Sequence, residues 1–214
     1  MRRFAPRVSE RLANTKRTLI AIGALALMAL AWTATGGSAA THGHARATNT
    51  PQEELAPLLA SARLATAKYA TSLRRAKRNG YTTIVTQHMP DMGWHFMNPE
   101  ITEFDVTRPP ILVYVKRGGR WQLVAFEWVF PKRPASDPLP GAQYGSFPAA
   151  CHYVDGTFEP AASESACRRR SPESGARFGF WHPDFVTLHL WAWYPNPDGI
   201  YASTNPLIRP FNAD

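Results

Sequence analysis

The sequence predicts an α+β domain with one long N-terminal amphipathic helix packed on a mainly antiparallel sheet. Three observations support this fold class: an apolar stripe at helical spacing after residue 50, several β-branched and aromatic segments further on, and two cysteines in a Pro- and Gly-rich region. Nineteen prolines argue against an all-helical domain. The Pro- and Gly-rich region predicts a long loop, which a disulfide between the two cysteines would hold in place.

The first 40 residues have the parts of a secretory signal peptide. Six basic residues precede an apolar run from Leu19 to Trp32, and small residues follow up to Ala40. The run is too short for the ~20 residues of a spanning helix, so we expect cleavage near Ala40 and export to the periplasm or the medium. An uncleaved leader would be the only membrane contact. We divide the chain into a signal peptide (1–40), a flexible arm (41–50) and a single globular domain (51–214).

Charge gives no reason to expect a nucleic-acid partner. The whole chain carries +8, but the leader holds six Lys or Arg and one Glu. The remainder has 18 basic and 15 acidic residues, a net charge of +3. No basic patch interleaved with aromatic residues is visible, so we predict no nucleic acid among the partners. The sequence does not indicate an oligomeric state.

The helix is predicted to begin at residues 50–53. Thr50 is suited to the N-cap, Pro51 to the first helical position, and Glu53 to the third position of a capping box. Apolar residues then recur at three- and four-residue steps over about 27 residues. Pro57 lies inside this span and would kink the helix or mark a later start. Basic residues in the last turn and Gly80 end it.

Four segments read as strands. They are residues 81–87, 111–116, 121–130 and 185–193. Gly118 and Gly119 suit the positive φ angles of a tight hairpin between the second and third segments. Residues 131–177 are rich in Pro, Gly, Ser and Ala and predict a long loop region. The residues after 194 predict an extended, turn-rich C-terminal arm.

Cys151 and Cys167 are the only cysteines of the chain. An isolated pair in an exported protein predicts a disulfide. The competing hypothesis, two thiolate metal ligands, has less support because no CxxC spacing is present.

Histidines occur twice at a spacing of seven, each pair enclosing a Pro-Asp step. His88 and His95 lie in HMPDMGWH, and His182 and His189 lie in HPDFVTLH. Imidazole is the commonest protein metal ligand, and copper and zinc both accept it. Glu127 is a carboxylate inside an apolar strand, and a buried carboxylate needs a partner. We therefore predict an exported protein that binds copper or zinc, with a ligand pool of His88, His95, His182, His189 and Glu127.

Two details of this site are also predicted. Pro90, Gly93 and Pro99 place His95 in a loop, where Met89, Met92 or Met97 would add a thioether ligand or simply fill the core. Strand alternation puts Glu127 on one face with Leu123, Ala125 and Val129.

An alternative function remains open beside the metal site. Rigid aromatic side chains could line a concave pocket of a small-molecule or glycan-binding module. A structural domain without metal is a further alternative, in which the aromatic side chains form the core. No hydrolase or nucleotide-binding motif is present, so the sequence identifies no reaction. The candidate pocket residues are Trp94, Trp181, Trp191, Trp193 and Tyr194.

Four segments resemble an uncharacterised family of exported bacterial proteins. They include HMPDMGWHFMNP (88–99) and FWHPDFVTLHLWAWYPNPDGIYASTNPLI (180–208), together with residues 111–131 and 141–158. The resemblance covers roughly residues 81–212. It implies a bacterial exported domain, and it brings no activity, cofactor or fold.

Overall fold

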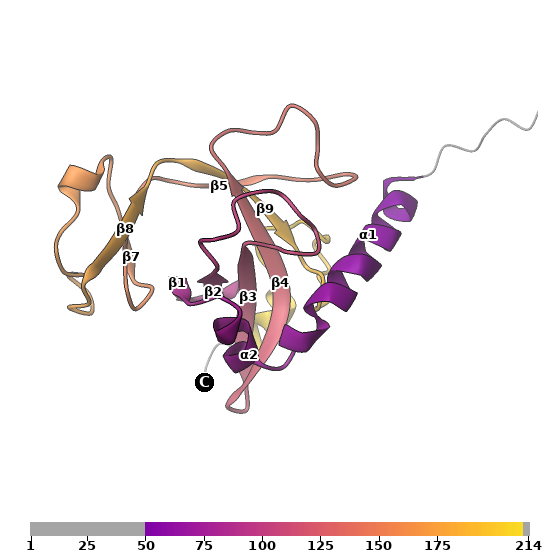
Figure 1. Cartoon of the computed structure of the whole chain (residues 1–214), viewed down its shortest axis with the longest axis horizontal. Coiled ribbons are helices and arrows are strands. Elements are labelled where there is room, and N and C mark those ends of the chain that lie inside the picture. Colours follow the sequence, from indigo (N-terminus) through magenta and orange to yellow (C-terminus); the bar gives the residue numbers. More distant parts are fainter. Residues whose placement is uncertain (1–49, 212–214) are drawn as a thin grey trace, which may run out of the picture. The chain divides into compact units, whose positions relative to one another are not determined.

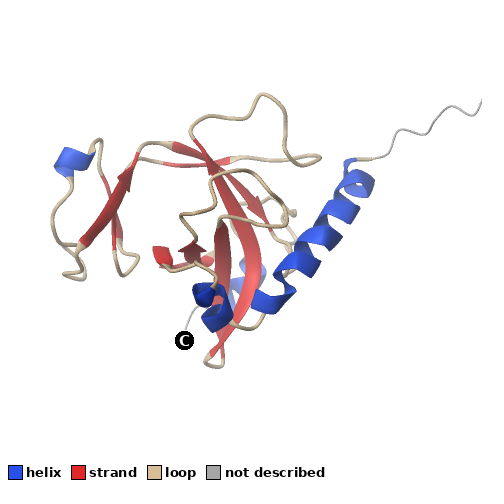
Figure 2. Cartoon of the chain, viewed as in Figure 1, coloured by secondary structure: helices blue, strands red, loops and turns tan. Residues whose placement is uncertain are grey.

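Two antiparallel sheets and a short helical segment make up residues 50–211, the part of the chain that the computed structural model describes (Figure 1, Figure 2). The predicted signal peptide (1–40) and residues 41–49 of the predicted arm lie outside the described residues. The mixture of helix and antiparallel sheet agrees with the predicted α+β class.

The helical segment covers the predicted span, but it is divided into shorter pieces and is less regular than predicted. It consists of α1 (Pro51–Thr66), the 3₁₀ turn η1 (Ala67–Tyr69) and α2 (Leu73–Arg78). Thr50 and Glu53 form the predicted capping box. The prediction of one continuous helix was wrong because Ser72 caps a second helix by accepting from the amide of Arg75. Since the segment begins at Pro51, it is not N-terminal in the whole chain.

The larger sheet has six strands in the order β1-β2-β3-β4-β9-β5, all antiparallel. Four of these strands match predicted segments, and Gly118 and Gly119 form the β3–β4 turn with φ angles of 54° and 70°. The strand β2 falls where a loop was expected. The bounds are β1 Thr83–Met89, β2 Gly93–Met97, β3 Ile111–Arg117, β4 Arg120–Phe130, β5 Gly145–Phe147 and β9 Phe185–Leu190.

The smaller sheet has the order β7-β6-β8, and Cys151 of the disulfide lies in its central strand. Its strands are β6 (Ala150–Tyr153), β7 (Phe158–Pro160) and β8 (Phe178–His182). The predicted bond between Cys151 and Cys167 is present, with their Cα atoms 5.6 Å apart.

The prediction of a loop over 131–177 was wrong in part. This segment contains β5, β6, β7 and the 3₁₀ turn η2 (Glu164–Ala166), whose three or four residues each are too few to show a periodic pattern. The C-terminal arm ends in a further 3₁₀ helix, η3 (Pro206–Phe211).

The two faces of the larger sheet differ in what covers them. One face carries most of the core side chains, including Phe96, Phe126 and Leu190, and packs against α1 and α2. Side chains alternate along a strand, so the neighbouring residues point to the opposite face. A smaller apolar cluster covers part of that second face, with Val113, Ala125, Trp191 and Ile208 of η3 among its members.

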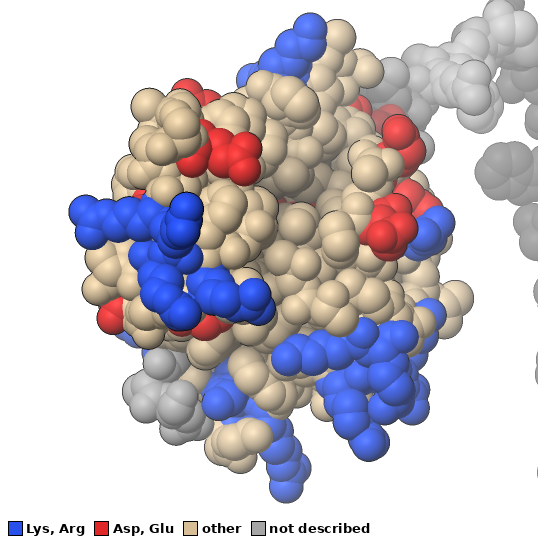
Figure 3. All heavy atoms as spheres, turned by 60° about the vertical axis from the view of Figure 1, so that its left-hand side comes forward, with Lys and Arg blue, Asp and Glu red and all other residues tan. Residues whose placement is uncertain are grey.

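Charged side chains lie on the surface of the described residues, with one exception. Figure 3 shows Lys and Arg gathered in groups and Asp and Glu scattered among uncharged residues. Glu127 is the only described Asp, Glu, Lys or Arg side chain that is buried. None of the described helices has the length and apolar character needed to span a membrane.

Candidate metal centre

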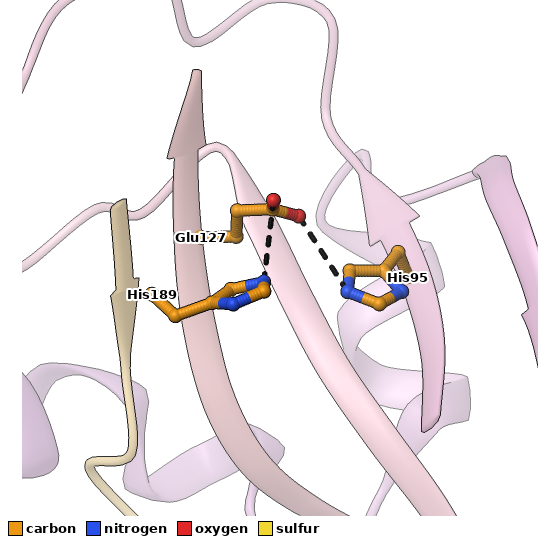
Figure 4. Close-up of side chains that lie close together, drawn as sticks. All are labelled: His95, Glu127 and His189. Carbon is orange, nitrogen blue, oxygen red and sulfur yellow. Dashed lines mark ion pairs between the residues drawn. The ribbon is translucent and has the colours of Figure 1, made fainter. Parts of the chain in front are cut away.

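Three polar side chains meet on the second face of the larger sheet: His95 from β2, Glu127 from β4 and His189 from β9 (Figure 4). Glu127 and His189 are direct partners across the β4–β9 pair. His95 comes from the other side of β3, where it is paired with Val113. The sheet register therefore brings together residues that lie up to 94 positions apart in the sequence.

The two distances from Glu127 to the histidines are close to those between ligands of one metal ion. Glu127 Oε2 lies 3.5 Å from His95 Nε2, and Glu127 Oε1 lies 3.2 Å from His189 Nε2. One donor atom from each residue lies within 4.8 Å of the others. Zinc with bonds of about 2.0–2.1 Å to tetrahedral ligands separates those ligands by about 3.3 Å. The His95–Glu127–His189 group can therefore hold a metal ion.

All three side chains are shielded from water. The exposed fractions are 2% for His95, 7% for Glu127 and 4% for His189. Burial lowers the pKa of His95 to about 4, although the nearby Glu127 carboxylate acts in the opposite direction. Burial alone would raise the pKa of Glu127, but His189 and His95 outweigh it and the net shift is downward. At neutral pH the group holds an ionised carboxylate beside a neutral His95.

The buried carboxylate has no cationic partner among the described Lys and Arg residues. Its only ion-pair contacts are with the two histidines. At His189 Nε2 the contact does not have the alignment of a hydrogen bond, and the Nδ1 atom is also without a hydrogen-bond partner. Burying a carboxylate costs free energy, and a bound cation would add to the stabilisation that the two histidines give it.

Thr86 orients His95. A hydrogen bond of 2.6 Å joins Thr86 Oγ1 to His95 Nδ1, and the two residues are partners across β1 and β2. When Nδ1–H donates to the hydroxyl, Nε2 carries the lone pair that a metal ion needs. Ligating histidines in proteins generally have such a hydrogen bond on the second ring nitrogen. In the sequence Thr86 is visible only as one member of a β-branched strand, and nothing in that pattern indicates this role.

His95 lies within a strand, not in the predicted loop. Pro90 and Asp91 form a short turn, and β2 begins at Gly93. Gly93 has a φ of +107°, and a Cβ atom there would lie 2.4 Å from the carbonyl oxygen of Tyr114. Asp91 forms an ion pair of 2.6 Å with Arg209 of η3, which ties the turn to the C-terminal segment. The glycine thus permits close strand pairing, and this pairing fixes the position of His95.

A β-bulge in β4 changes which residues share a face of the sheet with Glu127. Val113 is paired with Ala125 and Tyr114 with Leu123, so Val124 is the extra residue. Leu123 consequently belongs to the core on the helix side, while Ala125 lies in the cluster of the second face. The predicted grouping of Leu123 with Glu127 was wrong because sequence alternation alone does not reveal a bulge.

The other two histidines of the predicted ligand pool lie outside this group. His182 is in β8, where its Nδ1 donates to the carbonyl of Pro183 and its ring stacks on Phe185. Its ring centroid lies 4.9 Å from that of His152, so the pair belongs to an aromatic cluster of the smaller sheet. His88 is half-buried near the end of β1, and its Nε2 has no hydrogen-bond partner.

A cavity of about 90 Å³ adjoins the His95–Glu127–His189 group. His95, Glu127 and His189 all line it, and its other polar groups are hydroxyls. Met89 and Met92 line it too, which gives these two methionines a place near the centre; Met97 does not. The remaining lining residues are Val85, Thr86, Ser146, Phe147, Thr187 and Ser203.

The five aromatic residues of the alternative prediction do not form one group. Trp94 and Trp193 pack against the core on the helix side, Trp191 and Tyr194 belong to the cluster of the second face, and Trp181 lies in neither. Trp94 packs edge-on against Trp121. Trp191 is 3% exposed and donates from Nε1 to the carbonyl of Ala202. The other three have their own partners: Trp181 with Ala161, Trp193 with Thr66 and Tyr194 with Phe211. None of the five lines the cavity beside the His95–Glu127–His189 group.

Comparison with protein families, curated proteins and solved structures gives no match to this chain. The resemblance to an exported bacterial family therefore stays a prediction.

Proposed function

We propose that this chain is an exported protein that binds one copper or zinc ion through His95, Glu127 and His189. One observation carries the proposal: these three side chains bring a donor atom each to within 4.8 Å of the others. Among them, Glu127 is the only buried acidic side chain of the described residues. Two nitrogens and one carboxylate oxygen are a ligand set that suits either ion. The nearby thioethers of Met89 and Met92 would favour copper.

Export is the part of the proposal that rests on composition. The leader-like segment over residues 1–40 supports it, and so does the Cys151–Cys167 disulfide, because disulfides persist mainly in oxidising compartments. Mass spectrometry of the protein from the exported fraction is expected to give a chain starting at or near Thr41. An intact Met1 on protein recovered from the cytoplasm would contradict export and leave the metal site standing.

Calorimetric titration of metal-free protein with Zn²⁺ and Cu²⁺ tests the metal site. One ion per chain is expected, and bound ion is expected to raise the melting temperature because a ligand that binds only the folded state stabilises it. His95→Ala and His189→Ala are expected to remove most of the affinity. His88→Ala removes a histidine outside the group and serves as the matched control. Equal metal binding by the wild type and the three variants would contradict the proposal.

A further inference from the structure

The cavity beside the metal centre has a composition that selects a particular kind of ligand. Its volume of about 90 Å³ is large enough for a molecule of a few heavy atoms. Ser146, Thr187 and Ser203 line it, and within the described residues none of these hydroxyl groups makes a hydrogen bond. Each is therefore available to donate to a molecule in the cavity.

The ligand count of the centre leaves room for that molecule. His95, Glu127 and His189 supply three donors, and they face the cavity. A tetrahedral ion needs four, and zinc sites with three protein ligands keep the fourth position for water or a substrate. The cavity is where this fourth ligand would lie.

Charge decides which molecules can occupy the position. A divalent ion with one carboxylate and two neutral imidazoles has a net charge of +1. The other residues that line the cavity are uncharged: Val85, Thr86, Met89, Met92, Ser146, Phe147, Thr187 and Ser203. A net buried charge is unfavourable, so an anionic fourth ligand is preferred to a neutral one.

We propose that the cavity holds a small monoanion, such as hydroxide or a formate-sized carboxylate, as the fourth ligand of a divalent ion. The inference rests on the proposed metal site and goes further by assigning the class of molecule that reaches the ion. The ion would bind one oxygen of the anion, and the Thr187, Ser146 and Ser203 hydroxyls would donate to it. With hydroxide as the fourth ligand, the centre would carry a nucleophile.

The test uses Co²⁺, whose visible spectrum reports its coordination, in place of zinc. Azide and formate are titrated into the Co²⁺-loaded protein, with formamide as the neutral counterpart of formate. Saturable spectral changes are expected with the two anions and none with formamide. Thr187→Val and Ser203→Ala are each expected to weaken azide binding by roughly three- to tenfold, the effect of one lost hydrogen bond. Ser165→Ala, an exposed hydroxyl of η2, is the matched control.

The outcomes separate the two proposals. A Co²⁺ spectrum that neither anion changes would overturn the anion site and leave the metal site intact. Azide binding that is equally strong in Thr187→Val, Ser203→Ala and the wild type would overturn its placement in the cavity. Failure of the wild-type protein to bind Co²⁺, Zn²⁺ or Cu²⁺ would overturn both proposals.

Discussion

Glu127 and His189 are direct partners across β4 and β9, and their side chains meet at 3.2 Å on the face of the sheet opposite the helices. Each side chain is attached to a residue that is paired within the sheet, so neither can move far without disturbing β4 or β9. His95 is fixed in the same way by β2. A centre built on strands in this way is preorganised, which reduces the cost of binding an ion.

Glu127→Gln is expected to lower metal affinity at least a hundredfold while the fold is kept. The amide has nearly the same shape as the carboxylate but carries no charge, so it loses its main attraction to the ion. Equilibrium dialysis against Zn²⁺ measures the loss. Glu173→Gln, at an exposed position, is the control and should bind like the wild type. Unchanged affinity in Glu127→Gln would mean that the ion binds elsewhere.

Thr86→Val is expected to weaken metal binding by about ten- to hundredfold, the usual effect of losing a hydrogen bond behind a ligating histidine. Valine has a similar shape but cannot accept from Nδ1 of His95. Thr86→Ser keeps the hydroxyl and should restore most of the affinity. If valine and serine behave alike in the same titration, the hydroxyl does not orient the ring.

The metal-free protein is expected to lose stability as the pH falls from 6.5 to about 4. Burial lowers the pKa of His152 from 6.5 to about 4, although its hydrogen bond to the Val85 carbonyl acts in the opposite direction. His95 shifts in the same direction for the same main reason. Between these pH values the unfolded chain binds more protons than the folded one, so protonation favours unfolding. Above pH 6.5 neither ring contributes to the slope.

Urea unfolding at several pH values measures this dependence. His152→Phe keeps an aromatic ring beside Phe158 and Phe180 and removes one titrating group. Its free energy of unfolding should fall less steeply over the same range, whatever its absolute stability. The same slope in both proteins would show that His152 titrates normally in the folded state.

The double variant Cys151→Ser, Cys167→Ser is expected to be less stable by about 3 kcal/mol, because the bond closes a loop with a sequence separation of 16 residues. For a domain of this size the melting temperature should fall by roughly 6–12 °C. Metal affinity should change little, since the cysteines lie outside the His95–Glu127–His189 group. A calorimetric scan that gives the wild-type melting temperature would contradict this role.

The sequence allowed the elements with strong local signals to be predicted. The capping box at Thr50 and Glu53 and the Gly118-Gly119 hairpin depend on a few neighbouring residues, and both are present. The disulfide could be predicted because the chain has only two cysteines. Short strands such as β5 and β7 were missed because three residues show no period. The break between α1 and α2 was missed because the apolar stripe continues past the Ser72 cap.

The candidate site depends on information that local patterns do not contain. The seven-residue spacing of the histidines was its visible signal, yet the pairs separate: His95 and His189 meet, while His88 and His182 lie elsewhere. The strand order decides which histidines meet. β3 lies between β2 and β4 and sets the distance from His95 to Glu127, and the pairing of β4 with β9 places Glu127 beside His189. Thr86 and the cavity hydroxyls become relevant only once that order is known.

Anomalous diffraction at the zinc or copper absorption edge, from crystals of the metal-loaded protein, tests the central claim most directly. We predict one peak, placed at bonding distance from His95 Nε2, a carboxylate oxygen of Glu127 and His189 Nε2. For zinc these bonds should be about 2.0–2.2 Å long. An empty centre in crystals that carry the ion at another site, or the absence of any peak at saturating metal, would contradict it.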